Sequence, residues 1–253
     1  MNIIADLHTH TIASGHAYST LMENISCAKE ERLEILGISD HAPAMDGAPN
    51  ETYFENLRVI SREWGDLRVL RGVELNILNE YGDVDLSDEM LVELDYAVAS
   101  LHYPILPEGR RSLCTNAVVS VMSNPHVYII GHPDDDYMPL DYEALTLAAK
   151  QYNVALEVNN SSLRPGSFRK GAAENYRRML NPAKKLEVPI IVSSDSHICH
   201  DIGNFTRALE LLEELKFPEE LVVNSSPKRL AEFFECRKKA AQSEGKKKLL
   251  VAV

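Results

Sequence analysis

Seven short apolar runs recur along the chain, and six of them carry a histidine or an acidic residue near their C-terminal end. They cover residues 2–8, 35–41, 69–76, 96–102, 127–133, 154–160 and 189–197. Each run is rich in β-branched residues and too short for a stable helix, so each predicts a strand. Helix-like sequence separates the runs. This alternation predicts parallel strands, because a parallel pair needs a crossover connection.

The helical segments between the runs follow the spacing of apolar residues. Helices are predicted around Leu57, Ile60 and Trp64, around 145–149, and over 205–215, where the i, i+3, i+4 spacing marks a buried stripe. Residues 221–224 read as a short last strand. Ser226 is then expected to cap a final helix that has Pro227 in its first position.

Near-continuous hydrophobicity within the runs predicts strands that are covered on both faces, as in an α/β barrel or a doubly wound sheet. No linker, repeat or low-complexity segment divides the chain, so residues 1–253 are expected to form one domain. The tail over 243–253 is expected to be a loosely held terminus.

Composition excludes several functional classes. With 45% hydrophobic and 25% charged residues, the chain has the make-up of a globular protein with a sizeable core. A net charge of −12 argues against nucleic acid as a main partner. No apolar run approaches the roughly 20 residues of a membrane span, and the N-terminus lacks a signal-peptide layout. The four cysteines show no CxxC spacing, which predicts reduced thiols in a cytoplasmic protein.

Seven of the nine histidines lie at or just beyond the ends of the predicted strands. In a parallel barrel these ends gather at one face, so distant residues are expected to converge on one cavity. The predicted set is His8, His10, His16, His41, Glu74, His102, His132, Asp195 and His197. Asp6 shares a strand face with His8 and is expected to hydrogen-bond an imidazole.

Taken singly, these residues have ordinary interpretations: a satisfied core histidine, half of an ion pair at Glu74, a helix cap at Asp195. Together, and without a cation, they would suffer severe desolvation and repulsion. The joint pattern therefore predicts metal binding. Nine nitrogen and oxygen ligands suit two or three ions of zinc, iron or manganese, with a position left open for water.

The stretches that carry these residues resemble the polymerase and histidinol phosphatase (PHP) superfamily. They are DLHTH at 6–10, ISDH at 38–41, GVELN at 72–76, SLH at 100–102, GHP at 131–133 and SDSH at 194–197. LEVNNSS at 156–162 and RKG at 169–171 are similar to its YcdX-like phosphatase branch. The resemblance implies a distorted (β/α)7 barrel with a trinuclear metal centre, most simply of zinc, that hydrolyses phosphoesters.

The resemblance also implies a division of the ligands among three ions. His8, His10, Glu74 and Asp195 would hold the first ion, and Glu74 would bridge to a second that is completed by His102 and His132. His16, His41 and His197 would hold the third. Glu74, Asp195 and His197 are thus the expected catalytic residues, at a site where hydroxide between the first two ions attacks the phosphoryl group.

The loop over 159–171 is the expected phosphate side of the site. Arg164, Arg169 and Lys170 offer positive charge and Asn160 a neutral hydrogen-bond group, although these residues equally fit a solvated loop. His200 and Asp201 are weak candidates for protonating the leaving group. Cys199 and His126 are expected to lie outside the metal set.

The expected function is hydrolysis of small phosphomonoesters in the cytoplasm, with homo-oligomerisation suggested by the resemblance alone. Histidinol-phosphate phosphatase is the alternative nearest in chemistry. An amidohydrolase-like enzyme and a non-enzymatic metal-binding regulator are the others. No lysine at a predicted strand end is placed to bridge two metals, which counts against the amidohydrolase.

Overall fold

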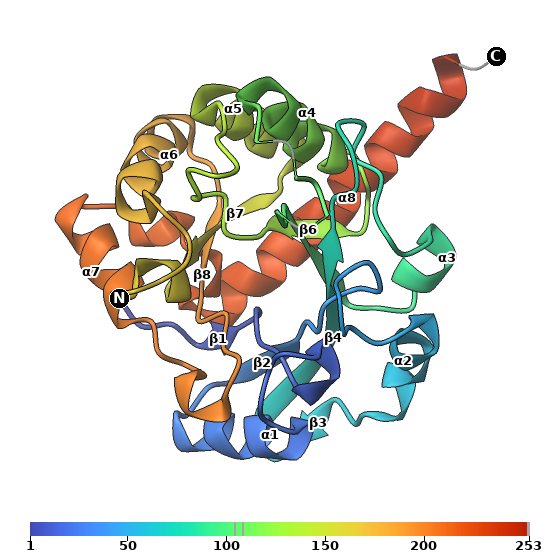
Figure 1. The fold of residues 1–253 in the computed structure, drawn as a ribbon, viewed down its shortest axis with the longest axis vertical. Coiled ribbons are helices and arrows are strands. Elements are labelled where there is room, and N and C mark those ends of the chain that lie inside the picture. Colours follow the sequence, from blue (N-terminus) through green and yellow to red (C-terminus); the bar gives the residue numbers. More distant parts are fainter. Residues whose placement is uncertain (104, 108, 252–253) are drawn as a thin grey trace.

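Seven parallel strands form a barrel that is nearly closed (Figure 1). The structure is a computed structural model that describes residues 1–103, 105–107 and 109–251, with side chains up to Ala240. The strands run in sequence order along the sheet, and a short β3 pairs antiparallel with β4. Their bounds are β1 Ala5–Asp6, β2 Ile35–Ile38, β3 Glu63–Trp64, β4 Leu67–Asn76, β5 Tyr96–Ser100, β6 Val127–Ile130, β7 Ala155–Asn159 and β8 Ile190–Ser193. The predicted distorted (β/α)7 barrel is confirmed.

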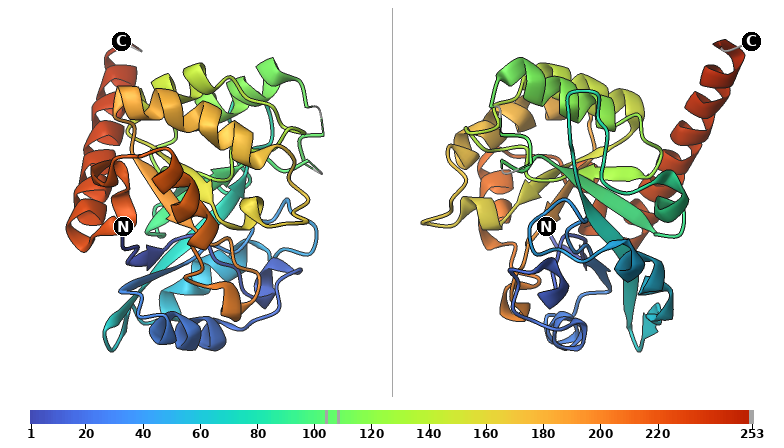
Figure 2. Two further views of the ribbon diagram at one scale, coloured as in Figure 1. Left: turned by 90° about the vertical axis from the view of Figure 1, so that its left-hand side faces the viewer. Right: turned by 45° about the vertical axis from the view of Figure 1, so that its right-hand side comes forward.

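Helices surround this sheet on the outside (Figures 1 and 2). The α-helices are α1 Leu21–Glu30, α2 Glu51–Asn56, α3 Asp88–Leu91, α4 Arg111–Val121, α5 Tyr142–Tyr152, α6 Ala172–Leu186, α7 Thr206–Glu214 and α8 Pro227–Val251. The short 3-10 turns are η1 Ile12–Ser14, η2 Leu57–Val59, η3 Ser161–Leu163, η4 Cys199–Asp201, η5 Glu219–Leu221 and η6 Val223–Ser225. Among the described residues, no helix is long and apolar enough to span a membrane.

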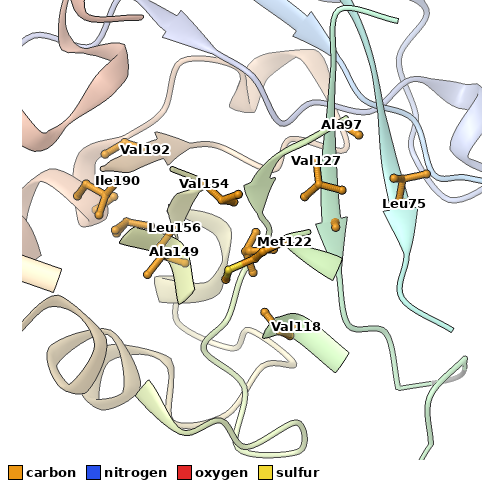
Figure 3. Packing of buried hydrophobic residues seen from close by; sticks show 14 of the residues in the cluster. Leu75, Ala97, Val118, Met122, Val127, Ala149, Val154, Leu156, Ile190 and Val192 are labelled. Atoms are coloured by element: carbon orange, nitrogen blue, oxygen red, sulfur yellow. The ribbon is translucent and has the colours of Figure 1, made fainter. Parts of the chain in front are cut away.

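The main core lies between the outer face of the sheet and the helices. Val118 and Met122 from the α4 region and Ala149 of α5 pack there against Leu156 and Ile190 of the neighbouring strands (Figure 3). Every one of these side chains is almost fully buried. Burial of apolar surface contributes about 25 cal/mol per Å² to the free energy of folding. This packing therefore holds the helices against the sheet and keeps the strand ends in place.

Helix α8 covers the N-terminal end of the barrel. Leu230 and Phe233 belong to the same buried cluster as Tyr128, the second residue of β6, and the Phe233 ring lies edge-on to that of Tyr128. The buried Arg237 donates from Nε to the carbonyl of Val127 at 2.8 Å and from Nη1 to that of Tyr152 at 2.9 Å. This end of the barrel is therefore filled by packing, which leaves the opposite end for chemistry.

Between β8 and β1 the side chain of Asn224 takes the place of a regular strand ladder. Asn224 Nδ2 donates to the carbonyls of Ala5 (2.8 Å) and Val192 (2.7 Å), and its Oδ1 accepts from the Val192 amide at 3.2 Å. The prediction of a strand over 221–224 is wrong. This segment forms η5 and η6 instead, and only Val222 makes a single parallel bridge to Ile190.

Two further predictions can be compared with the observed elements. The helix predicted around Leu57, Ile60 and Trp64 ends with η2 at Val59, and Trp64 lies in β3. The cap predicted at Ser226 is confirmed, because its Oγ accepts from the Arg229 amide at 3.2 Å and α8 begins at Pro227. Residues 252–253 and the side chains beyond Ala240 lie outside the described residues, so the loosely held tail over 243–253 stays a prediction.

We expect Asn224→Ala to lower the free energy of unfolding by about 3 kcal/mol, because the change leaves buried backbone groups of two strands without a partner. Chemical denaturation measures this loss. Asn116→Ala, on the exposed face of α4, is the control and should change stability little. Equal stability of the two variants would show that Asn224 does not hold β1 and β8 together.

Candidate active site

The nine residues predicted as metal ligands meet at the C-terminal end of the barrel. Each parallel strand except β7 delivers one or two of them, and His16 reaches the group from the loop after η1. His8 and His10 follow β1, where the intervening Thr9 pairs with Ser196 beyond β8. This pairing brings the segments that follow the first and the last strand, β1 and β8, side by side.

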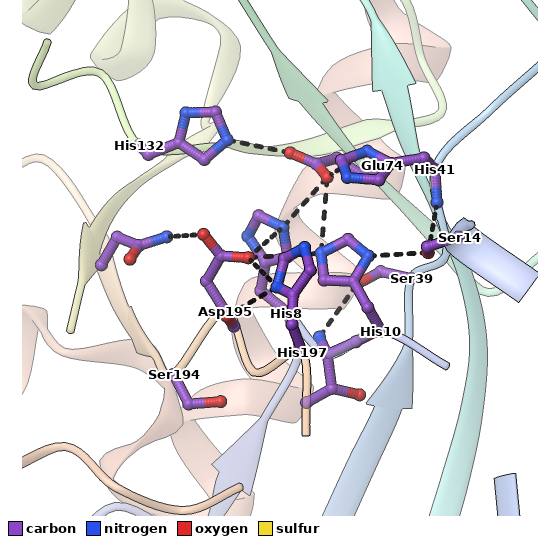
Figure 4. A network of polar contacts seen from close by, with 12 residues as sticks. His8, His10, Ser14, Ser39, His41, Glu74, His132, Ser194, Asp195 and His197 are labelled. Atoms are coloured by element: carbon purple, nitrogen blue, oxygen red, sulfur yellow. Dashed lines mark hydrogen bonds and ion pairs between the residues drawn. The ribbon is translucent and has the colours of Figure 1, made fainter. Parts of the chain in front are cut away.

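Glu74 lies at the centre of the group, on β4, and is fully buried (Figure 4). Each of its carboxylate oxygens faces its own set of imidazoles. Oε1 lies 2.9 Å from His132 Nε2 and 3.3 Å from His102 Nε2, and Oε2 lies 2.8 Å from His41 Nδ1, 3.3 Å from His8 Nε2 and 3.5 Å from His10 Nε2. One side chain thus faces imidazoles from four other strand ends.

Asp195 is the second buried carboxylate of the site. Its Oδ1 lies 3.3 Å from His10 Nε2 and 3.6 Å from His197 Nδ1, and its Oδ2 accepts from Arg169 Nη1 at 3.0 Å. Asp195 and His132 have φ values of 52° and 28°. Such backbone conformations are costly for residues with a side chain and cluster at functional sites.

Three imidazoles gather on the open side of this centre. The His16 ring lies 4.9 Å, centroid to centroid, from those of His41 and His197. The His10 ring lies 4.5 Å from His41 and 4.3 Å from His197, and so joins this group to the deeper one. His16 is exposed, whereas His10 and His41 are buried.

Neighbouring side chains fix the orientation of three of the rings. His8 Nδ1 donates to Glu157 Oε1 at 2.7 Å, and His102 Nδ1 lies 2.7 Å from Asn76 Oδ1. Asn76 uses its amide nitrogen for other acceptors, so its oxygen accepts from the imidazole. In each case the acceptor holds Nδ1–H, which turns Nε2 toward Glu74.

Two successive hydrogen bonds, through Ser14 to Asp40, fix the orientation of the His10 ring. Ser14 Oγ donates to Asp40 Oδ1 at 2.6 Å and accepts from His10 Nδ1 at 3.0 Å. Tyr53 also donates to this carboxylate, at 2.6 Å from Oδ2. His10 Nε2 is therefore left with its lone pair, like that of His102.

Sequence reasoning missed Glu157 and assigned its role to Asp6. Asp6 accepts from the amides of Ser194 and Gly203 at 3.1 Å, so it ties β1 to the chain beyond β8 and does not orient an imidazole. Glu157 is a lone acidic residue inside the apolar run 154–158. A carboxylate at a fully buried strand position is itself a signal, because such groups are almost never buried without a partner.

The buried atoms of the centre fit divalent metal ions. Among the described residues, the atoms without a hydrogen-bond partner include His8 Nε2, His10 Nε2, His41 Nδ1, His102 Nε2 and Glu74 Oε2. The ligand atoms form two groups that share Glu74, one with His8 and His10 and one with His41 and His102. Unpartnered polar atoms are costly when buried, and an ion satisfies nitrogen and carboxylate donors together.

The electrostatics of the site agree with this fit. Burial lowers the pKa of His102 to about 4 and, with the nearby His197 and His41, holds the pKa of His10 well below its usual range. These rings are therefore neutral near pH 7, the form that coordinates metal. Burial opposes a charge on Glu74, but His41, His8 and His102 outweigh it and hold the pKa of that carboxyl well below its usual range.

A cavity of about 960 Å³ opens onto the centre. Its floor includes His16, His41, His102, His132, Asp195 and His197. Its lining also includes the basic residues Arg164, Arg169 and Lys170 and the apolar residues Leu101, Val118, Ile130, Met138 and Leu140. The cavity thus combines ligand atoms, positive charge and apolar surface.

The four residues expected to bind phosphate occupy different environments. Arg169 is almost buried and pairs with Asp195, while Arg164 Nη1 pairs with Asp201 Oδ2 at 2.7 Å. Lys170 Nζ donates to the carbonyl of Ser167 at 3.2 Å from an exposed position. Asn160 is not among the described residues that line the cavity.

Asn160 acts instead at the start of a helix. Its Oδ1 accepts from the amides of Arg207 (2.9 Å) and Ala208 (3.1 Å), in the first turn of α7. These hydrogen bonds hold the Asn160 side chain against α7, and the residue is not one of the described residues that line the cavity.

The remaining candidates lie around or away from the centre. Asp201 lines the cavity beside Arg164. Cys199 and His200 lie with Cys27, on the side of the β8–α7 loop that faces α1. The half-buried His126 directly precedes β6 and so lies toward the end of the barrel that α8 covers.

Comparison with known proteins agrees with this arrangement. The chain is 42% identical over 239 residues to a probable phosphatase of Clostridium acetobutylicum, which covers 94% of this chain and 97% of that protein. It is 40% identical over 237 residues to a probable phosphatase of Shewanella amazonensis, with 94% of each chain covered. These relatives support a hydrolase.

Among solved structures, the fold is similar to that of histidinol phosphate phosphatase from Lactococcus lactis subsp. lactis, which was crystallised with zinc, L-histidinol and phosphate. The TM-score is 0.63 at 18% identity, over 86% of this chain and 95% of that one. The PHP domain family matches residues 6–161, a stretch that contains seven of the nine site residues, from His8 to His132, and the orienting Glu157. The chain is a phosphatase-type hydrolase that belongs to the PHP superfamily.

Proposed function

We propose that the protein hydrolyses small phosphomonoesters at a centre of three divalent metal ions, most simply zinc. The observation that carries the proposal is the position of Glu74, whose two carboxylate oxygens face separate groups of imidazoles within 3.5 Å. A carboxylate placed in this way is suited to bridge two ions, since one oxygen is available to each. The imidazoles of His16, His41 and His197, on the open side of the centre, are suited to hold a third ion.

Some residues of the chain would hold the metal ions, and others would orient these ligands. Bound divalent ions supply a water of lowered pKa and neutralise phosphoryl charge. His8, His10, Glu74 and Asp195 would hold the first ion, His102 and His132 would complete the second with Glu74, and His16, His41 and His197 would hold the third. The relays through Glu157, Asn76 and Ser14 would keep the imidazole lone pairs aimed inward during turnover.

Lys170, Arg164 and Arg169 would form the phosphate side. Lys170 has the most freedom to contact a phosphate, because its ammonium group is exposed and donates to a backbone carbonyl, that of Ser167. Arg169 is already committed to Asp195, so it would act by holding that carboxylate as much as by binding substrate. Asn160 is not proposed as a phosphate ligand.

The apolar residues of the cavity lining support a substrate whose alcohol carries an apolar or aromatic part. Leu140 and Met138 are buried there, and such a surface favours burial of carbon over a strongly hydrated group. A chain with a net charge of −12 would select small phosphorylated molecules in the cytoplasm over nucleic acid. Homo-oligomerisation stays a prediction.

Replacement of the central carboxylate tests the proposal most simply. We expect Glu74→Gln to lose at least one equivalent of bound metal and at least about 100-fold in kcat, because an amide cannot bridge two ions in the same way. Elemental analysis and turnover of a phosphomonoester panel measure both effects. Glu213→Gln, on the exposed face of α7, is the matched control and should behave as wild type.

The same panel separates the alternatives. It contains aromatic and aliphatic phosphomonoesters, histidinol phosphate, amides and lactones. Preference for histidinol phosphate would identify that activity, hydrolysis of amides or lactones alone would favour an amidohydrolase, and metal binding without turnover would favour a regulator. Unchanged metal content and turnover in Glu74→Gln would contradict the bridging role.

Lys170→Ala tests the phosphate side. We expect KM for a phosphomonoester to rise roughly tenfold or more, as for loss of one hydrogen bond to a charged group, with a smaller effect on kcat. Inhibition by inorganic phosphate should weaken in parallel. Lys150→Ala, an exposed lysine on α5 that pairs with Glu187, is the control; an unchanged KM in Lys170→Ala would remove that residue from the site.

Glu157→Gln tests the positioning of His8. We expect metal affinity to fall roughly 10–100-fold, because the His8 imidazole loses its charged acceptor and becomes a weaker ligand. Competition with a chelator measures this affinity independently of turnover, and Glu213→Gln serves again as control. If affinity stays at the wild-type level, Glu157 supports only the backbone of His132, to whose amide its Oε2 is also bonded.

A further inference from the structure

A second cluster of ligand-type side chains lies apart from the nine-residue centre. Cys27 of α1 and Cys199 and His200 of η4 place their sulfur and nitrogen atoms within 4.8 Å of one another. The two segments pack side by side, with the η4 turn directly against α1 (Figure 1). Residues 172 positions apart in the sequence thus converge on one point.

The chemistry of this cluster differs from that of the main centre. Two thiols and an imidazole suit a thiophilic cation, whereas the nine-residue centre offers only nitrogen and oxygen. Cys199 is buried, Cys27 is half-buried and His200 is exposed, so the cluster has an apolar floor and an entry path from solvent. Burial, the neighbouring Cys199 and the negative charges of Glu30 and Glu31 raise the pKa of the Cys27 thiol to about 11, so a thiolate there needs a cation beside it.

We propose that Cys27, Cys199 and His200 bind a single thiophilic divalent cation such as Zn²⁺, in a site separate from the catalytic centre. The three side chains supply three positions of a tetrahedron, and a water or a carboxylate oxygen from the end of α1 completes it. On binding, each thiol releases its proton to solvent and becomes a thiolate ligand. No electron transfer is involved.

Such a site would brace the loop that carries His197. The His197 carbonyl accepts from the Tyr18 amide at 2.8 Å, and the Cys199 amide donates to Ser19 Oγ at 2.9 Å. A cation joining Cys199 to α1 therefore holds together the two segments that contain His16 and His197. This consequence rests on the proposed function, whereas the binding site itself does not.

Cobalt substitution tests the site directly. The full-length protein is reduced, stripped of metal and loaded with Co²⁺ alone. A thiolate-to-cobalt charge-transfer band in the near ultraviolet reports only this site, because the nine-residue centre has no sulfur ligand. We expect the band in wild type, its loss together with one metal equivalent in Cys27→Ser and in Cys199→Ser, and its retention in Cys236→Ser, an exposed cysteine of α8.

Several outcomes would overturn the site. One is the absence of the band from wild-type protein that has bound cobalt, and another is its persistence in Cys27→Ser. A Cys27–Cys199 disulfide in the protein as purified, with no band after reduction, would assign the pair to redox chemistry. Phosphatase turnover separates the two proposals: a band without turnover would sink only the proposed function, and turnover without a band only this site.

Discussion

The structure depends on how buried negative charge is balanced at the C-terminal end of the barrel. Glu74, Asp195 and Glu157 are buried together, and His8 contacts all three. Burial disfavours a charged His8, yet Glu157 and Glu74 outweigh it and raise the pKa of that imidazole well above its usual range. The carboxylates thus demand positive charge at this point, and divalent ions can supply it to every ligand at once.

The rest of the fold can be understood as the frame that imposes this crowding. Parallel strands in sequence order bring their C-terminal ends to one face, and α8 fills the other end with Phe233 and Arg237. Closure between β8 and β1 does not use a regular ladder. Asn224 and Asp6 bridge the two strands through side chains, which sets the spacing between the histidines after β1 and the Asp195 segment after β8.

How far sequence predicts such a site depends on whether the signal is local. The strand ends and their histidines were predictable because each lies in its own apolar run, and parallel topology then requires them to converge. The hydrogen-bond partners of these residues could not be predicted, because they lie far away in the sequence. Glu157 and His8 are 149 positions apart, and Asp6 and Ser194 are 188 positions apart. The i+2 spacing places Asp6 on one face of its strand, but it does not say from which donors the Asp6 carboxylate accepts hydrogen bonds.

The remaining errors have similar causes. Residues 221–224 have the composition of a strand, but Asn224 satisfies the neighbouring backbone with its side chain, so no ladder forms there. Asn160 has a polar group suited to phosphate, yet its side-chain oxygen accepts from the free amides at the start of α7. Trp64 follows an apolar helical spacing but pairs in β3, because Leu67 across the turn offers an antiparallel partner.

The central claim is that Glu74 bridges metal ions held by separate groups of imidazoles. Anomalous diffraction from crystals grown with excess Zn²⁺ tests it most directly. The account predicts one peak beside Oε1, between His102 and His132, and another beside Oε2, near His8 and His10. Well-ordered crystals with Glu74 bonded directly to these imidazoles, and no anomalous peak between them, would contradict it.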